Sequence, residues 1–333
     1  MSMNLIKKTN RIFIAGHKGM VGSSIKKKLI QLSYKNLQTP SREELDLLDN
    51  KSVENWFKNN MPEVVILAAA KVGGIEANSK YPADFIFENL KIQTNIIENS
   101  WKNNVKRFIF LGSSCIYPKF AEQPIKENYL LTGKLENTNE PYAISKIAGI
   151  KLCASLKTQY DFDAISLMPT NLYGPGDNYH SLNSHVVPSL IRKFHDAKIN
   201  NKPHVTCWGT GSPKREFLHV DDIAEAVVFV LEKVSSDNKN LFEEDLKYTG
   251  LLNVGVGKDM SIKELAELIA TNLDYRGRIY WDDSKPDGTP RKLLDVSKLN
   301  RLGWTSKIDI ESGIRLTIKS FKNELNENTI RFK

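Results

Sequence analysis

Short apolar runs alternate with longer segments of helical periodicity along the first half of the chain. The apolar runs predict strands over residues 11–15, 36–39, 64–69, 107–111 and 164–168. The periodic segments predict helices over residues 20–32, 52–59, 83–103 and 141–160. This alternation is typical of an α/β fold in which helices cover both faces of a doubly wound, Rossmann-like parallel sheet.

The pattern changes after Pro175. Residues 176–183 are polar and are expected to leave the sheet, whereas a helix over 222–233 and a strand over 251–254 predict a return to it. The remainder, including residues 261–273 and 309–325, is expected to form a separate, smaller lobe. We therefore predict a larger domain of residues 10–175 and 222–255, and a smaller α/β lobe of residues 176–221 and 256–333.

Composition narrows the class of protein. The 333 residues are 41% hydrophobic and 26% charged, which is typical of a globular chain. No apolar run approaches the roughly 20 residues of a membrane span, and the first residues lack a signal peptide, so we expect a cytoplasmic protein. The net charge of +8 is spread along helices, which argues against a nucleic-acid partner. Three scattered cysteines predict neither a disulfide framework nor a metal site.

A glycine triplet follows the first predicted strand directly. In such a turn the first glycine permits a sharp bend, the second lets the backbone approach a pyrophosphate, and the third lets helix pack on strand. The alternative is a plain structural turn, but the position before a helix N-terminus favours dinucleotide binding. The turn comprises Gly16, His17, Lys18, Gly19, Met20, Val21 and Gly22.

The end of the second predicted strand bears on the choice of cofactor. Sites for NADH usually place an acidic residue there, whereas the extra phosphate of NADPH calls for arginine. Here Arg42 follows closely and Lys18 lies in the glycine turn, so we predict NADP(H). Glu43 and Glu44 leave NADH open if the turn shifts, although we interpret them as acids in the first turn of a helix.

Tyr142 and Lys146 lie one helical turn apart near a predicted helix start. An ammonium and the helix dipole would both stabilise a phenolate, as a tyrosine that exchanges protons near neutral pH requires. Such pairs also occur by chance on surfaces. Ser113 follows the fourth predicted strand, and ligands gather at the carboxyl ends of parallel strands, so we favour a catalytic Ser–Tyr–Lys site.

Several segments together resemble the extended short-chain dehydrogenase/reductase family over nearly the whole chain. The likeness is closest to members that epimerise and reduce a GDP-sugar. The segments are residues 14–22, 68–74, 81–85, 111–118, 139–143, 168–174, 183–186, 215–222 and 285–295, of which the last is not shared by the wider superfamily.

The resemblance implies a conversion and the residues that carry it. The conversion is that of GDP-4-keto-6-deoxy-D-mannose to GDP-L-fucose, by inversion at C3 and C5 and then reduction of C4 with NADPH. Tyr142 would donate a proton, Lys146 would assist it and contact the cofactor ribose, and Ser113 would position the substrate oxygen. Cys115 and His185 would exchange the protons beside the ketone, for which thiol and imidazole are suitable types.

The resemblance also implies contacts to both ligands and a homodimer. The larger domain would bind the dinucleotide, with further contacts from Asp49 (to the adenine), Leu111, Gly112, Ser114, Pro169, Thr170, Asn171, Leu172 and His185. The smaller lobe would bind the nucleotide sugar, through Asn171, Lys193, Trp208, Arg215, Asp287 and Lys292. Whether Arg192 or Lys193 reaches the diphosphate stays open.

Two other functions compete with the full epimerase and reductase. One is an enzyme of the same fold that only reduces, only epimerises or takes a GDP-heptose, and the sequence leaves hexose against heptose open. The other is a dinucleotide-binding regulator that has lost its chemistry. The presence of Cys115 and His185 beside the Ser–Tyr–Lys set argues against a simple reductase and against a silent regulator.

Overall fold

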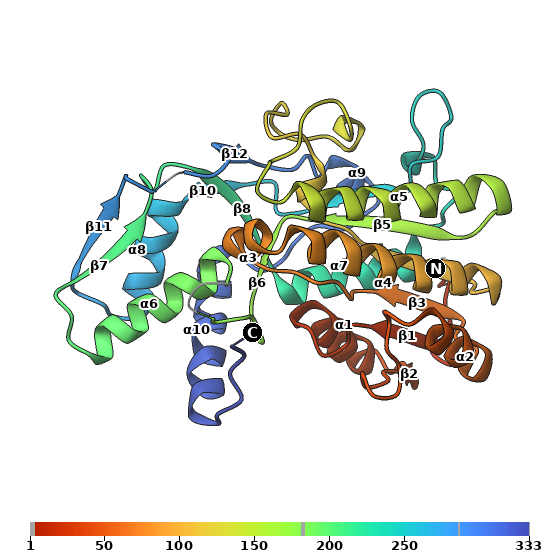
Figure 1. Cartoon of the computed structure of the whole chain (residues 1–333), viewed down its shortest axis with the longest axis horizontal. Coiled ribbons are helices and arrows are strands. Elements are labelled where there is room, and N and C mark those ends of the chain that lie inside the picture. Colours follow the sequence, from red (N-terminus) through yellow and green to blue (C-terminus); the bar gives the residue numbers. More distant parts are fainter. Residues whose placement is uncertain (1–3, 181–183, 286, 333) are drawn as a thin grey trace.

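A parallel sheet forms the centre of the larger part of the molecule (Figure 1). The computed structural model describes residues 4–180, 184–285 and 287–332. The six strands run in the order β2-β1-β3-β4-β5-β9, and every neighbouring pair is parallel. Their bounds are β1 Arg11–Ala15, β2 Asn36–Gln38, β3 Val64–Leu67, β4 Arg107–Leu111, β5 Ala164–Pro169 and β9 Leu251–Val254.

Helices cover both faces of this sheet because its strands are apolar on both sides. In β1, Ile12 and Ile14 pack in one core while Phe13 and Ala15 pack in the other. The first core includes α1 (Met20–Gln31) and α7 (Val220–Lys233). The second includes α2 (Asn50–Asn60), α4 (Pro82–Lys102) and α5 (Glu140–Tyr160). The doubly wound α/β fold predicted from the sequence is confirmed.

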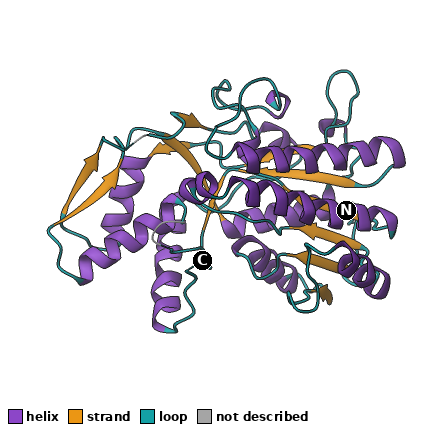
Figure 2. Ribbon diagram, in the orientation of Figure 1, coloured by secondary structure: helices purple, strands orange, loops and turns teal. Residues whose placement is uncertain are grey.

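The remaining elements form a smaller body at one end of the sheet, on the left in Figures 1 and 2. β8 pairs in parallel with β6 and β12 and antiparallel with β10, while β7 pairs in parallel with β11. The strands are β6 Asn171–Tyr173, β7 His204–Trp208, β8 Lys214–His219, β10 Asp259–Ser261, β11 Arg278–Asp282 and β12 Arg291–Lys292. The helices are α6 Val186–Ile199, α8 Ile262–Asn272 and α10 Ile310–Asn326, with the short α3 Ile75–Lys80 and α9 Ser297–Arg301 beside the large sheet.

A third apolar core holds the smaller body together. It joins buried side chains of α6, α8 and α10, among them Phe194, Leu265 and Phe321. The carboxylate of Glu216, in β8, is fully buried and accepts the backbone N–H groups of Val256, Gly257 and Leu294. Glu216 thereby ties β8 to the segment after β9 and to the segment after β12.

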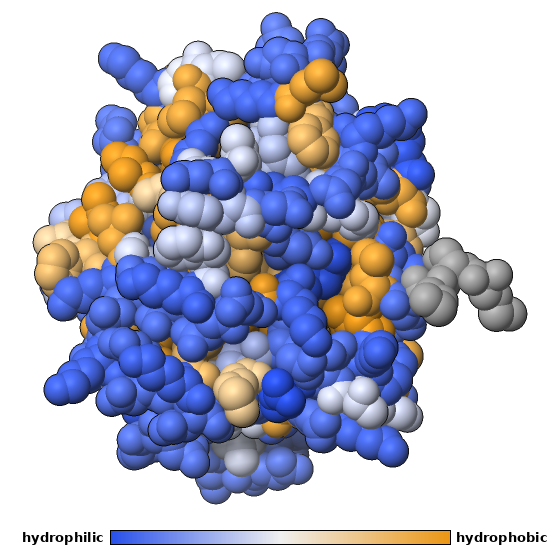
Figure 3. Space-filling view, turned by 90° about the vertical axis from the view of Figure 1, so that its right-hand side faces the viewer, coloured by the Kyte–Doolittle hydropathy of each residue, from blue (hydrophilic) through white to orange (hydrophobic). Residues whose placement is uncertain are grey.

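Most predicted elements have the expected bounds within a few residues, but one prediction is wrong. Glu43 and Glu44 do not begin a helix, because α2 starts only at Asn50. Instead Ser41 and Glu44 exchange side-chain and backbone hydrogen bonds in a tight turn. The surface view in Figure 3 is mostly hydrophilic with separate apolar patches. In the described parts of the chain no helix is long and apolar enough to cross a membrane.

Candidate active site

The glycine turn lies at the carboxyl end of β1 and leads into α1. Gly16 has a φ of +88°, and a Cβ there would lie 2.7 Å from the nitrogen of Ala69. A Cβ at Gly22 would lie 2.2 Å from the carbonyl oxygen of Gly16. Gly19 begins α1 without a side-chain cap, so the first N–H groups of the helix are available to an anion. His17, Lys18, Met20 and Val21 complete this turn.

Cations gather beside the turn. The pKa of the exposed Glu43 carboxyl is lowered by a hydrogen bond from Ser41 and further by Lys18 and Arg42. Lys18 and Arg42, far apart in the sequence, thus lie around one carboxylate. The pKa of His17 is lowered by burial and then by Lys26 and Lys18. This surplus of positive charge suits a phosphate group.

Two further groups of predicted cofactor residues lie at the carboxyl ends of β4 and β5, as the glycine turn does at the carboxyl end of β1. Leu111 ends β4, followed by Gly112 and the buried Ser114, and a Cβ on Gly112 would meet the side chain of Met168 at 2.2 Å. Pro169 ends β5, and the next residues pair with β8 through backbone and side chain. These are Thr170, Asn171 and Leu172. Asp49 caps α2 by accepting the N–H of Lys51.

Ser113, Tyr142 and Lys146 meet where the loop after β4 faces the start of α5. The Ser113 hydroxyl accepts the N–H of Cys115 at 3.2 Å and hydrogen-bonds the Tyr142 phenol. Lys146 is buried, its Nζ donates to the carbonyl of Leu111 at 2.9 Å, and Nζ lies 6.0 Å from the centre of the Tyr142 ring. The structure therefore brings the predicted Ser–Tyr–Lys set together.

The charge state of Tyr142 differs from the expectation. We expected Lys146 to stabilise a phenolate, but burial and the nearby Cys115 raise the pKa of Tyr142, and the hydrogen bond from Ser113 only partly opposes this rise. Lys146 turns its ammonium to the Leu111 carbonyl, and burial lowers the pKa of Lys146 to about 8. Tyr142 is accordingly held protonated, ready to give a proton.

Cys115 lies in the same loop, between two nitrogen donors. Nδ2 of Asn139 is 3.3 Å from its sulfur and Nζ of Lys292 is 3.8 Å from it. The half-buried thiol also lies near the charge of Arg215 and near Tyr142. The structure therefore places Cys115 beside donors and cations within the Ser–Tyr–Lys region.

His185 comes from another element. It precedes α6 as its N-cap residue without a side-chain capping bond. The imidazole is accessible to solvent, yet the protein atoms packed around it lower its pKa, which favours the neutral form at pH 7. Within the described ranges the structure gives no hydrogen bond between His185 and Cys115, so their pairing stays a prediction.

The predicted sugar-nucleotide residues divide into two groups. In the first, Lys292 contacts Cys115, Arg215 is close to Cys115 and Asp287, and Asp287 accepts both the N–H and the hydroxyl of Thr210. Asn171, in β6, donates to the carbonyl of Glu216.

The second group lies on β7 and α6. Trp208 ends β7 with 63% of its surface exposed, and Lys193 donates to the carbonyl of Thr206. Lys193 and Arg192 both line a cavity of about 460 Å³ against β7. Arg192 is held by the carbonyl of Tyr179 and by Asp196, whereas the Lys193 ammonium, among the described residues, donates to the carbonyl of Thr206 alone, so Lys193 is the less constrained of the two.

Two residues of this region were not among the site residues predicted from the sequence. Asn139, whose amide reaches Cys115, precedes Pro141 and resembles an ordinary helix cap. Glu216 follows Lys214 and Arg215 in a charged run, which gives no sign that its carboxylate is fully buried.

Comparison with known proteins places the chain in a family. The NAD dependent epimerase/dehydratase family model matches residues 12–243. The chain is 54% identical to GDP-L-fucose synthase 1 of Arabidopsis thaliana over 312 residues, 93% of this chain and 92% of the relative. It is 52% identical to the GDP-L-fucose synthase of Escherichia coli (strain K12) over 323 residues, 97% and 98% of the two chains.

A solved structure also matches closely. The GDP-mannoheptose C4 reductase of Campylobacter jejuni with NADP bound superimposes with a TM-score of 0.86 at 37% identity, covering 95% of this chain and 99% of that one. The fold, the glycine turn, the Ser–Tyr–Lys set and these likenesses agree: the chain belongs to the NAD dependent epimerase/dehydratase family and groups within it with the GDP-L-fucose synthases.

Proposed function

We propose that this protein converts GDP-4-keto-6-deoxy-D-mannose to GDP-L-fucose, with NADPH as the reductant. The observation that carries the proposal is that two sets of acid–base groups lie together where the segment after β4 faces the start of α5. One set is Tyr142 with Ser113 and Lys146, and the other is Cys115 with its nitrogen donors. A simple reduction needs only the first. Relatives with 52–54% identity to the chain are GDP-L-fucose synthases, which supports the same activity.

The residues present fit a bound NADPH. Gly16 and Gly22 have no room for a side chain, as the sharp bend and the close packing of the helix in a dinucleotide-binding turn require, and Gly19 leaves the backbone open to a pyrophosphate. Lys18 and Arg42 would hold the additional phosphate of the adenosine ribose. When bound, NADPH supplies the hydride for C4.

The protein groups would then act in sequence. Protons next to the C4 ketone are acidic, so the thiolate of Cys115 would remove them at C3 and C5 and His185 would return them on the opposite face. Ser113 would hold the C4 oxygen and Tyr142 would protonate it as it becomes a hydroxyl. Lys146 would donate to the cofactor ribose in place of the Leu111 carbonyl.

One incubation tests this proposal. Purified protein is mixed with GDP-4-keto-6-deoxy-D-mannose and NADPH, and the product sugar is identified by NMR. We expect GDP-L-fucose and one equivalent of NADP per sugar. NADPH consumption with a product that keeps the manno configuration at C3 and C5 would reduce the protein to a C4 reductase.

A GDP-heptose is the second candidate substrate, because the solved relative at 37% identity is named a GDP-mannoheptose C4 reductase. Identities of 52–54% to GDP-L-fucose synthases favour the hexose. The same assay with a GDP-4-keto-heptose separates the two: a higher kcat/KM for the heptose would reverse the assignment.

We further propose a cytoplasmic homodimer. This extends the family likeness and rests on no interface in this structure. Static light scattering of the purified chain should give twice the monomer mass of 37.8 kDa, and a monomeric mass would overturn it.

A further inference from the structure

Asn139 occupies a position where an asparagine normally caps a helix, but it does not do so. It is the N-cap residue of α5, and such a side chain usually accepts a backbone N–H of the first turn. Here no side-chain capping bond forms, and Nδ2 instead donates to the sulfur of Cys115 at 3.3 Å. The amide gives up its usual stabilising contact for one to the thiol.

The other end of the amide is also informative. Oδ1 of Asn139 is buried and has no hydrogen-bond partner among the described residues. A buried acceptor without a partner is costly, so native proteins rarely leave one outside functional sites. Among the described residues, the amide of Asn139 is therefore engaged through its Nδ2 contact to Cys115 and not through Oδ1.

Donors and cations from three elements lie near the sulfur of Cys115. Lys292, from β12, lies 3.8 Å from Sγ and has donors only, so the sulfur must accept from it. Arg215, from β8, adds a second positive charge nearby, and Tyr142, from α5, faces the thiol as a neutral phenol. Glu136 acts on Arg215 and is itself paired with Lys119 at 2.9 Å.

We propose that Asn139 is a positioning residue that holds Cys115 as a thiolate, directed at the protons that the enzyme exchanges. This rests on the proposed function for the identity of those protons. Lys292 and Arg215 supply charge, but both have long side chains, whereas the amide of Asn139 is short and starts a rigid helix. Asn139 thus fixes the direction of the sulfur as well as favouring its ionisation.

The pH dependence of thiol alkylation tests the proposal without any substrate. The full-length protein is treated with iodoacetamide at a series of pH values, and modification of the Cys115 peptide is followed by mass spectrometry. Cys153 and Cys207 are buried, and Cys115→Ser gives the background. Removing a hydrogen bond to an ionised group is expected to raise the pH midpoint of alkylation by about one pH unit in Asn139→Ala.

Two further variants sharpen the result. Asn139→Asp keeps the shape of the side chain but replaces the donor by a negative charge, so the pH midpoint of Cys115 alkylation should rise further in this variant. Asn139→Asp also replaces the alanine variant in the test if the alanine variant does not fold. Asn137→Ala, at an exposed asparagine two residues earlier, should leave the midpoint unchanged. An unchanged midpoint in folded Asn139→Ala or Asn139→Asp would overturn the proposal and leave Asn139 a structural residue.

The same variants separate this inference from the proposed function. In D2O with NADP, Asn139→Ala should catalyse deuterium exchange at C3 and C5 of the keto sugar about tenfold more slowly than the parent does. Raising the pH should restore part of the rate. Loss of rate without recovery at high pH would contradict the assigned role. A shifted alkylation midpoint in a protein that never acts on the keto sugar would refute the proposed function alone.

Discussion

Two lysines of one helix have opposite surroundings. Lys146 and Lys157 both lie on α5 and are both buried, three turns apart. Lys146 has a carbonyl as its partner, and burial lowers its pKa to about 8. Burial of Lys157 acts in the same direction, but hydrogen bonds to Asp161 and Asp237 raise its pKa overall. One end of the helix holds an uncompensated cation and the other a paired one.

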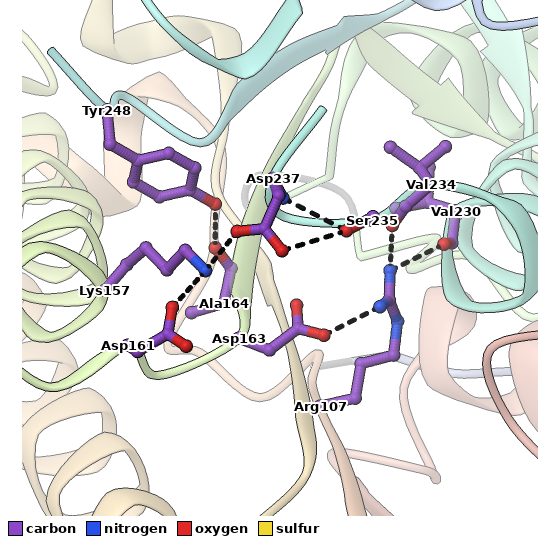
Figure 4. A network of polar contacts seen from close by, with 10 residues as sticks. All are labelled: Arg107, Lys157, Asp161, Asp163, Ala164, Val230, Val234, Ser235, Asp237 and Tyr248. Atoms are coloured by element: carbon purple, nitrogen blue, oxygen red, sulfur yellow. Dashed lines mark hydrogen bonds and ion pairs between the residues drawn. The ribbon is translucent and has the colours of Figure 1, made fainter. Parts of the chain in front are cut away.

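The same contrast extends to the two edges of the sheet. At the amino ends of β4 and β5, Arg107 forms an ion pair of 2.8 Å with Asp163 and donates to the carbonyls of Val230 and Val234 (Figure 4). At the carboxyl ends lie Ser113, Cys115 and Tyr142, and within the described ranges no carboxylate pairs with Lys146. Ion pairs at the amino ends of the strands stabilise the fold, whereas the side chains at the carboxyl ends are available for chemistry.

Tyr142→Phe should have the largest effect on activity. The ring remains, but the transferable proton is lost, so reduction at C4 should fall by about 10²–10⁴-fold. The rate is measured as NADPH oxidation at saturating substrate, with thermal unfolding as the control for the fold. Retention of most of the turnover would remove Tyr142 from the mechanism.

Arg107→Leu should affect stability instead. It leaves the partly buried Asp163 carboxylate without its cation and the carbonyls of Val230 and Val234 without their donor, which should cost about 3 kcal/mol of unfolding free energy. Urea denaturation measures this loss, and kcat per folded molecule should stay near that of the parent. A fall in kcat with unchanged stability would reverse the roles assigned to the two edges.

Lys146→Met should abolish most reduction yet stabilise the fold. The folded pKa of Lys146 is about 8 and its ordinary value is 10.5, so between these pH values the unfolded chain binds more protons than the folded one. The contribution of Lys146 to stability should therefore rise from pH 8 to 10.5, by about 3 kcal/mol, and the difference in unfolding free energy between the parent and Lys146→Met isolates it. This rise should be absent in Lys146→Met, which should also be the more stable protein near pH 7.

Lys157→Met is the matched control. Its partners Asp161 and Asp237 are largely exposed, so stability should fall by no more than about 1 kcal/mol, and activity should remain. Equal effects of Lys146→Met and Lys157→Met on stability and on rate would contradict the different roles assigned to the two lysines.

Arg42→Ala should have the smallest effect of the series. Loss of one charge-assisted contact at an exposed site should raise KM for NADPH by about tenfold and leave KM for NADH unchanged. Steady-state kinetics with both cofactors measure the ratio. An equal rise for both would mean that Arg42 only shapes the turn between β2 and α2.

The sequence predicts those features that depend on neighbours along the chain. The turn from Gly16 to Gly22 and the spacing of Tyr142 and Lys146 are local patterns, and both have the predicted placement. Features that depend on distant partners were not predictable in this way. The ion pair of Arg107 joins strands through Asp163, and the Glu216 carboxylate is satisfied by two segments that come after it in the chain.

The protonation state of Tyr142 also depends on residues distant in the sequence. Its spacing from Lys146 predicted a phenolate, but the direction of the ammonium depends on the Leu111 carbonyl, 35 residues earlier. The link between Asn139 and Cys115 likewise spans 24 residues. Local patterns therefore identify the residues of this site, and tertiary packing determines their charge.

Solvent deuterium exchange tests most directly whether Cys115 and Tyr142 carry separate chemistries in one site. GDP-4-keto-6-deoxy-D-mannose is incubated in D2O with NADP and each protein, and deuterium at C3 and C5 is followed by NMR. The parent and Tyr142→Phe should both incorporate deuterium, whereas Cys115→Ser, whose hydroxyl is far harder to ionise than a thiol of pKa about 8.5, should do so much more slowly. Exchange in Cys115→Ser as fast as in the parent would contradict the account.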